Sequence, residues 1–244
     1  MKTIVKLLLI VSIVSVLSQC KKETDTSVTI PDNNFLNALI SQGVDTSGDG
    51  IISTDEAALV HYLDVGLRNI SDLKGIEAFV NLNGLSCHGN SLTALDVSNN
   101  TALTTLYCID NHIANLDVSN NTALEYLDCF GNNLTSLDVS NNIYLRHLGC
   151  ACNRLTALDV SVNTSLYGLE CYLNQLTTLD VSKNIALTSL YCDNNQLTSL
   201  DVTNNTALTV LACYSNQLTT LDVSKNTALK ELYCLDNQLT TLDV

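Results

Sequence analysis

Eight cysteines recur at a constant interval of 21 residues along the chain. They are Cys87, Cys108, Cys129, Cys150, Cys171, Cys192, Cys213 and Cys234. Leucines and asparagines recur in the same register, so each unit reads Leu-x-x-Leu-x-Cys-x-x-Asn-x-Leu-x-x-Leu-Asp-Val-Ser-x-Asn. A fixed period of about 20 to 30 residues is typical of solenoids, because a repeat that cannot bury its apolar side chains alone buries them against its neighbours.

This pattern resembles that of the leucine-rich repeat proteins, with Cys as the third apolar residue. The resemblance covers residues 63–244 and implies about eight to nine repeats. Leu85 and Cys87 alternate with variable residues, which indicates a short strand with one face inward, and in-register copies stack only in parallel. We therefore expect an α/β solenoid with a parallel β-sheet on its concave face. The series ends at Val244 without a polar repeat, so we expect the C-terminal cap to be missing.

Two polar columns accompany the apolar ones. The asparagines from Asn90 to Asn237 follow each strand, where turning backbone groups need partners that a buried side-chain amide can supply. The aspartates from Asp96 to Asp243 are expected to accept hydrogen bonds from backbone N–H groups of the opposite turn. Stacked carboxylates that bind calcium, as in Gly-rich secreted rolls, are the alternative for this second column.

The cysteine ladder is expected to hold free thiols. Neighbours on in-register parallel strands keep their Cβ atoms about 4.8 Å apart, whereas a disulfide needs roughly 3.8 Å. The thiols should therefore point inward and act as small apolar side chains. Zinc is the alternative, but sulfur atoms in one line do not surround an ion tetrahedrally. Cys152 lies outside the ladder and is either a loop residue or an exposed, reactive thiol.

The first residues read as an export signal. Lysines precede an apolar run from Leu7 to Leu17, which is too short for a membrane span, and Cys20 follows. The arrangement resembles the lipobox of bacterial lipoproteins and implies a lipid anchor at Cys20, although Gln19 departs from the usual small residue; ordinary signal cleavage is the alternative. We expect a signal peptide at 1–19 and a tether at 20–29 with nothing to bury.

Acidic residues outnumber basic ones by 25 to 11, which gives a formal net charge of −14. Such a chain repels phosphate backbones, so we expect no nucleic-acid partner.

A twelve-residue stretch before the repeats matches the calcium loop of EF-hands. Oxygen donors stand at positions 1, 3, 5, 9 and 12, a carbonyl stands at position 7, and Gly50 occupies the sharp turn at position 6. The expected Ca²⁺ ligands are Asp45, Ser47, Asp49, Ile51, Ser53 and Glu56. A Gly-rich turn with a helix-capping acid is the alternative.

Helices are expected on both sides of this loop. Asp32 can cap an entry helix, and residues 57–62 can form the exit helix. Together they predict an EF-hand-like helix-loop-helix cap over residues 30–62, similar to the cap of internalins, in which calcium stabilises the structure.

Aromatic residues gather at the outward strand positions. They are Tyr107, Tyr126, Phe130, Tyr172, Tyr191, Tyr214 and Tyr233. We expect each tyrosine to lie between an inward Leu and an inward Cys, in one exposed stripe suited to binding a partner. The alternative is that β-propensity alone draws tyrosine into strands. His147, Cys150 and Cys152 share a strand, but no nucleophile, base and orienting group converge, so we expect no enzymatic activity.

These features predict a cell-envelope binding protein of the bacterial surface leucine-rich repeat type, which engages a protein or glycan through its concave face. It would be exported and lipid-anchored at the outer membrane or cell surface, with a secreted or periplasmic protein as the alternative. A structural or adhesive spacer with no defined ligand is the competing function.

Overall fold

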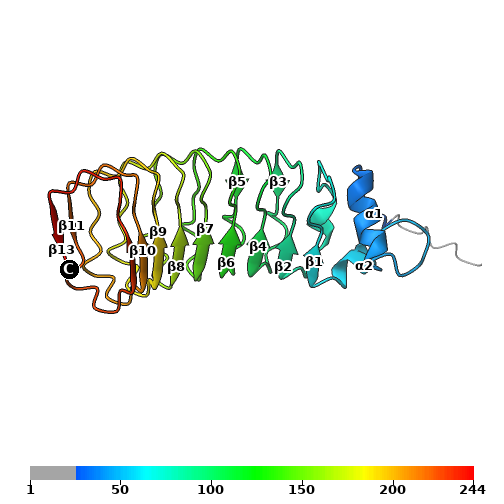
Figure 1. Ribbon diagram of the computed structural model, residues 1–244. Coiled ribbons are helices and arrows are strands. Elements are labelled where there is room, and N and C mark those ends of the chain that lie inside the picture. Colours follow the sequence, from blue (N-terminus) through cyan, green and yellow to red (C-terminus); the bar gives the residue numbers. More distant parts are fainter. Residues whose placement is uncertain (1–25) are drawn as a thin grey trace, which may run out of the picture.

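The computed structural model describes residues 26–244, which form an elongated solenoid with a small helical cap at its N-terminal end (Figure 1). The cap holds α1 (Asn33–Ser41) and α2 (Thr54–Ala58), and the short 3-10 helix η1 (Ile76–Ala78) lies in the first repeat. No helix within residues 26–244 is long and apolar enough to cross a membrane.

A nine-stranded parallel sheet runs along one side of the solenoid (Figure 1). Its strands, in order, are β1 (Tyr62–Asp64), β2 (Gly84–Ser86), β4 (Thr105–Tyr107), β6 (Tyr126–Asp128), β7 (His147–Gly149), β8 (Gly168–Glu170), β9 (Ser189–Tyr191), β10 (Val210–Ala212) and β12 (Glu231–Tyr233). Every neighbouring pair is parallel, which confirms the predicted stacking. Leu85 pairs with Leu106 at the 21-residue period, whereas Leu63 pairs with Leu85 across 22 residues.

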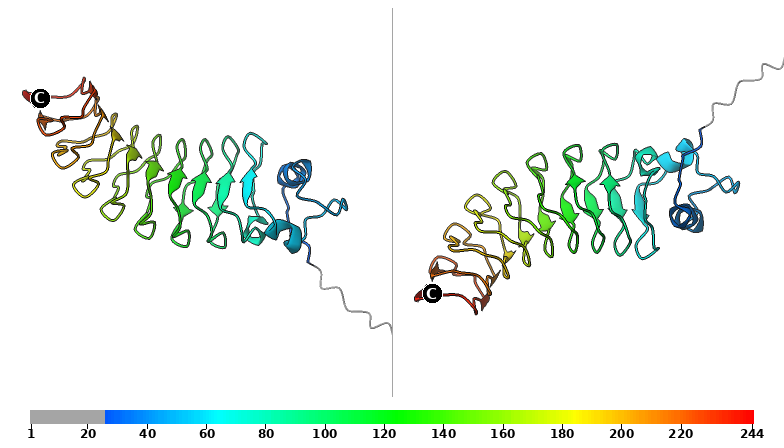
Figure 2. Two further views of the ribbon diagram at one scale, coloured as in Figure 1. Left: turned by 90° about the horizontal axis from the view of Figure 1, so that it is seen from below. Right: turned by 90° about the horizontal axis from the view of Figure 1, so that it is seen from above.

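The opposite side of the solenoid consists of turns and short strands rather than helices. Two small parallel pairs lie there, β3 (Leu95–Asp96) with β5 (Leu116–Asp117), and β11 (Thr220–Asp222) with β13 (Thr241–Asp243). The predicted parallel-sheet solenoid is confirmed, and the described helices are confined to residues 33–78, in the cap and the first repeat. Asp, Ser and Asn on this opposite side bind nearby backbone groups and favour turns over helices. The stacked turns form a rod that bends towards its C-terminal end (Figure 2).

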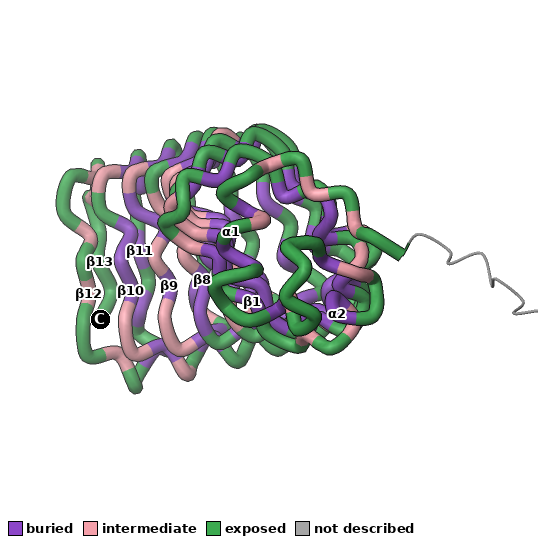
Figure 3. The backbone as a smooth tube through the Cα atoms, turned by 90° about the vertical axis from the view of Figure 1, so that its right-hand side faces the viewer, coloured by how far each residue is buried: buried purple, intermediate pink, exposed green. Residues whose placement is uncertain are grey.

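The core is a set of stacked columns, and in Figure 3 buried stretches, in purple, recur from one turn of the backbone to the next. Leu85, Cys87, Leu92 and Val97 are all fully buried, and so are most of their counterparts along the rod. Ile113 takes the place of a leucine and is equally buried. Because each side chain contacts the equivalent one in the next repeat, the interior continues from one repeat to another without a break.

The predicted role of the first asparagine column is confirmed. Asn153 Oδ1 accepts a hydrogen bond from the backbone N–H of Leu134 at 2.9 Å. Its Nδ2 donates to the carbonyl oxygens of Cys129, Cys150 and Ala151 at 3.0, 3.2 and 3.1 Å. One amide therefore links two neighbouring repeats and satisfies buried backbone groups that no water reaches.

A second asparagine ladder lies at the other edge of the core. Asn163 Nδ2 donates to the carbonyl oxygens of Val139 and Asn142 at 3.2 and 2.8 Å, and Asn163 is fully buried. Its Oδ1 has no hydrogen-bond partner, and the same holds for six equivalent asparagines in the described chain. The amide N–H groups thus carry this ladder.

The aspartate column caps turns as predicted. Asp159 Oδ1 accepts a hydrogen bond from the backbone N–H of Ser161 at 2.9 Å, and its counterparts bond in the same way. Hydrogen bonds from Ser161 hold the pKa of Asp159 below its usual value.

The cysteine ladder consists of free thiols, as predicted. Seven of them, from Cys87 to Cys213, are fully buried, whereas Cys234 on the edge strand β12 is half-buried. Burial raises the pKa of Cys87 and of Cys213 to about 12, with smaller effects of Asp64 and Cys234 respectively. Such thiols are poor nucleophiles at neutral pH and serve as core side chains.

We predict that Asn153→Ala lowers the free energy of unfolding by on the order of 3 kcal/mol, because it leaves several buried carbonyl groups and one N–H without partners. Urea denaturation measures the change. Asn141→Ala is the matched control, since Asn141 is exposed and makes a single 3.3 Å hydrogen bond to Ser119. A loss at Asn153 no larger than the control's would contradict the ladder's role.

Candidate functional site: the sheet face

The outward side chains of the nine-stranded sheet form three columns, which we call the sheet face. The first precedes the inward leucine of each strand, the second lies between that leucine and the inward cysteine, and the third follows the cysteine. Because side chains of a strand alternate, all three positions point away from the core. The sheet face is therefore broader than one stripe.

The expectation that all six tyrosines share one column was wrong. Tyr107, Tyr191 and Tyr233 lie between leucine and cysteine, as expected. Tyr126 precedes its leucine, whereas Tyr172 and Tyr214 follow their cysteines. The error arose because the positions flanking the leucine–cysteine pair also face outward. Phe130 occupies the third column too.

These rings lie outside the solenoid interior. Tyr214 and Tyr233 are exposed by 36% and 50%, whereas Tyr107, Tyr126, Phe130, Tyr172 and Tyr191 are half-buried. The sheet face thus offers aromatic surface on rigid strands.

A groove of about 480 Å³ opens towards the C-terminal half of the sheet face. Four tyrosines and two acids surround a single small residue. The lining residues are Glu170, Tyr172, Tyr191, Asp193, Ala212, Tyr214 and Tyr233. Ala212 is 3% exposed and lies between Tyr191 and Tyr233 in the strand register, so it forms the floor of a slot between two aromatic side chains.

A comparable alanine nearby leaves no such slot. Ala151 lies between Phe130 and Tyr172 in the third column, and the rings of Phe130 and Tyr172 meet over it with centroids 6.1 Å apart. Tyr191 and Tyr233 make no such ring contact within the described chain. The hydroxyl of Tyr233 donates instead to Glu231 at 2.9 Å.

The sheet face carries acids and no lysine or arginine in its three columns. The acids are Asp64, Asp128, Glu170, Asp193 and Glu231. Two histidines lie beside these acids: His88 is 4.0 Å from Asp64, and His147 is 3.4 Å from Glu170. A hydrogen bond to Glu170 raises the pKa of His147, while burial raises the pKa of Asp128.

The two cysteines near His147 do not form a catalytic group with it. Cys150 is fully buried, and burial places its pKa well above the usual thiol value. Cys152 is partly exposed, burial raises its pKa as well, and its φ is 53°. It occupies the left-handed turn position that Gly131, Leu173 and Asn194 fill in other repeats. Cys152 is therefore a turn residue.

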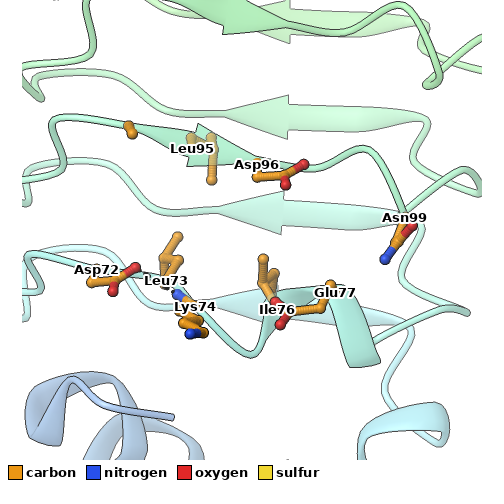
Figure 4. A pocket seen from close by; sticks show the side chains of 9 residues that line it. Asp72, Leu73, Lys74, Ile76, Glu77, Leu95, Asp96 and Asn99 are labelled. Atoms are coloured by element: carbon orange, nitrogen blue, oxygen red, sulfur yellow. Dashed lines mark hydrogen bonds between the residues drawn. The ribbon is translucent and has the colours of Figure 1, made fainter. Parts of the chain in front are cut away.

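A second groove, of about 360 Å³, lies away from the sheet face, between the η1 segment and β3 (Figure 4). Asp72, Lys74 and Glu77 line it from the first repeat, and Asp96 and Asn99 line it from the next. Its lining residues include no aromatic side chain and no Ser, Thr or Cys. The sheet-face groove is therefore the stronger candidate for recognition.

The cap loop is closed by hydrogen bonds from its own backbone. Glu56 Oε1 accepts from the N–H groups of Thr46 and Ser47 at 2.8 and 2.9 Å, and Oε2 accepts from the N–H of Ser53 at 2.9 Å. Asp45 accepts from the N–H groups of Gly48 and Gly50 at 2.7 and 2.9 Å. Asp49 Oδ1 accepts from the N–H of Ile51 at 2.9 Å.

As they lie, the loop carboxylates are bound to N–H donors of the chain itself. Both oxygens of Glu56 are occupied by N–H and O–H donors, and Ser53 with Glu56 forms a helix-capping box. No group of three His, Cys, Asp or Glu side chains within residues 26–244 is placed to hold a metal. Ca²⁺ binding would require Glu56 to exchange these donors for the ion.

The capping box also moves the exit helix. This helix was expected at 57–62, but α2 begins at Thr54 and ends at Ala58 because Ser53 caps it within the loop. Tyr62 is then free to begin β1. The entry helix starts at Asn33, and Asp32 caps it as predicted.

The cap is bound tightly to the first repeat. Asp32 Oδ2 accepts hydrogen bonds from the backbone N–H and the hydroxyl of Ser71, both at 2.8 Å. The rings of Phe35 and Phe79 pack with centroids 6.5 Å apart. α1 therefore covers the apolar end of the solenoid.

Part of the predicted tether also packs on the cap. The N–H of Val28 donates to Ile52 at 2.7 Å, and Val28 contacts the core, so residues 26–29 are not a free tether. The mistake was to treat Val28 as having nothing to bury. The predicted signal peptide at 1–19 and the lipid anchor at Cys20 lie outside the described residues.

We predict that Glu56→Gln lowers the melting temperature of the cap by a few degrees, because an amide cannot accept all the donors that surround Glu56. Hydrogen bonds, first from Ser53 and then from Ser47, lower the pKa of Glu56 from 4.5 to about 2. Since the folded-state pKa is the lower one, this stabilisation is present above pH 4.5 and disappears as the pH falls towards 2.

Thermal unfolding between pH 2 and pH 7 tests this role, with Asp55→Asn as control because Asp55 is exposed in the same helix. An equal pH profile for wild type and Glu56→Gln would contradict it. Repeating the melts with millimolar calcium or with chelator tests the ion separately.

A scan against protein-family models finds no match, and a search of curated proteins finds none either. Solved structures do match. The functional domain of InlJ from Listeria monocytogenes, described as including a cysteine ladder, is 43% identical with a TM-score of 0.81. The match covers 86% of this chain and 47% of that one, so the chain spans about half the length of the InlJ protein in that structure.

Two further internalins of Listeria monocytogenes show the fold alone. The internalin inlF is 24% identical with a TM-score of 0.80, over 88% of this chain and 69% of that one. The internalin C2 is 22% identical with a TM-score of 0.75, over 85% of this chain and 93% of that one. The chain therefore has a leucine-rich repeat fold, similar to that of these Listeria monocytogenes proteins.

Proposed function

We propose that the sheet face is a surface for binding a protein partner. The observation that carries this proposal is the groove in which Tyr172, Tyr191, Tyr214 and Tyr233 surround Ala212 on a rigid sheet. Tyrosine offers large contact area at a small cost in side-chain entropy, so it is common where proteins bind one another. The similarity to InlJ supports a role of the solenoid in binding a protein partner.

The contrast between inward and outward positions also supports binding. Inward columns repeat the same residue in almost every unit, because each must fit its neighbour. The second outward column instead reads Ser86, Tyr107, Asp128, Gly149 and Glu170 in successive repeats, followed by Tyr191, Ala212 and Tyr233. A passive spacer needs no concentration of large aromatic residues beside a hollow, so we favour recognition over the spacer.

The proposal also includes export of the protein, a lipid anchor at Cys20 and a calcium ion in the cap. A binding face of this kind is useful on an exposed protein, and the sequence of residues 1–20 is typical of exported lipoproteins. Calcium binding rests on the spacing of Asp45, Asp49 and Glu56 alone. A glycan remains the alternative ligand for the aromatic surface.

We predict that changing Tyr191 and Tyr214 to Ala weakens binding of a protein partner at least about thirtyfold, the scale of an interface hot spot, with little effect on stability. The immobilised protein would capture partners from cell-surface extracts, and biolayer interferometry would then measure each affinity. Tyr144→Ala is the control, since Tyr144 is exposed by 60% in a turn outside the sheet face.

Leu190→Ala should behave in the opposite way, because Leu190 is fully buried and its loss destabilises the fold by about 2–5 kcal/mol. Partners that bind the wild type and the double Tyr191, Tyr214 variant equally would contradict the proposed function and favour a spacer.

A further inference from the structure

We propose that the sheet-face groove binds a basic peptide segment and seats one arginine side chain over Ala212, between Tyr191 and Tyr233. This inference rests on the proposed function and names the chemistry of the partner. Three features of the groove carry it: the spacing of the strands, a buried carboxylate without a counter-ion, and the absence of Lys and Arg from the three sheet-face columns.

The slot has room for one flat group. Neighbouring strands lie about 4.8 Å apart, so the backbones that carry Tyr191 and Tyr233, on either side of Ala212, are about 9.6 Å apart. A planar group stacked between two rings needs about 3.5 Å on each side, or roughly 7 Å in all. The ring of Tyr233 is exposed by 50% and can adjust, while Ala212, 3% exposed, places only a methyl group between the rings.

The groove contains a buried acid with no cation beside it. Asp193 is 3% exposed and lines the groove, where its Oδ2 accepts a hydrogen bond from Asn194 Nδ2 at 2.9 Å. A hydrogen bond to Asp193 also raises the pKa of Tyr214. Glu170 faces His147, but Asp193 takes part in no ion pair within the described chain. A buried carboxylate without a counter-ion is costly, and a cationic ligand would remove that cost.

The surroundings favour arginine over a sugar or a lysine. The three sheet-face columns hold five acids and no Lys or Arg. A basic peptide lying along the sheet face is therefore attracted electrostatically at several points. The faces of aromatic rings attract cations, and a neutral glycan carries no positive charge that could use this attraction. A guanidinium group is planar, stacks on aromatic rings and binds a carboxylate through two N–H groups, whereas an ammonium group is a compact and strongly hydrated charge.

Fluorescence anisotropy with three labelled hexapeptides tests the proposal at about 150 mM salt, which screens long-range attraction. The probes are hexa-arginine, hexa-lysine and hexa-citrulline, the last being uncharged and of similar shape to arginine. We expect the wild type to bind hexa-arginine more tightly than hexa-lysine, and at least tenfold more tightly than hexa-citrulline.

Variants of the protein distinguish specific arginine binding in the groove from non-specific electrostatic attraction. Asp193→Asn should weaken hexa-arginine binding about tenfold, and Ala212→Tyr should do the same by filling the slot without changing charge. Asp201→Asn is the control, since it removes an equal charge from an exposed turn outside the sheet face and should change affinity less than twofold. Circular dichroism melts confirm folding, and Ala212→Leu replaces the tyrosine variant should that variant unfold.

Equal weakening by Asp193→Asn and Asp201→Asn, with no effect of filling the slot, would overturn the arginine seat and leave only non-specific attraction. Preference for hexa-citrulline or equal binding of all three peptides would overturn it as well. A captured partner that depends on Tyr191 and Tyr214 but binds Asp193→Asn normally would refute the seat and leave the proposed function intact.

Discussion

The structure depends on the side-chain amide that links each repeat to the one before it. Asn153 bonds to backbone groups on both Cys129 and Cys150, so neither turn can be satisfied without the other. The interior follows the same rule, because each leucine and cysteine is covered by its counterpart in the next repeat. Stability therefore lies between repeats rather than within them, and the fold is a one-dimensional stack.

This constraint leaves the outward positions free for function. A stack fixed by inward contacts holds its strands in register whatever residue faces solvent, so size and charge can differ from strand to strand. Where a small residue falls between two large ones, the local neighbours decide the outcome. Phe130 and Tyr172 meet over Ala151, whereas Tyr233 donates a hydrogen bond to Glu231 and makes no ring contact with Tyr191 in the described chain. The candidate site is thus a property of sequence differences along a uniform scaffold.

The periodic part of the fold could be predicted from the sequence. The 21-residue period requires parallel stacking, and strand spacing excludes disulfides between neighbouring thiols, as the free ladder confirms. The turn chemistry of Asp159 and Asn153 also follows from their positions. These features rest on local rules that repeat many times, so each repeat reinforces the same inference.

Features that depend on several strands at once could not be predicted. The slot above Ala212 requires the register of three strands and the direction in which Tyr233 leans. The burial of Asp193 results from rings on neighbouring strands, and a single strand pattern does not show it. In the cap, the position of Glu56 suits either a calcium ligand or a member of a helix-capping box. The spacing alone did not reveal that Ser53 caps α2. The second asparagine ladder had a signal in the column of Asn100 and Asn121, whose regularity in a turn indicates burial.

The most direct test of the stack is the reactivity of the ladder thiols. Intact-mass spectrometry would count iodoacetamide adducts at pH 8 across a urea series. Since Cys87 to Cys213 are fully buried and unpaired, we expect all seven to stay unmodified in the native protein and to react together in one denaturation step. Modification of central thiols such as Cys150 in the native protein, or their recovery as disulfide-linked pairs, would contradict the in-register stack.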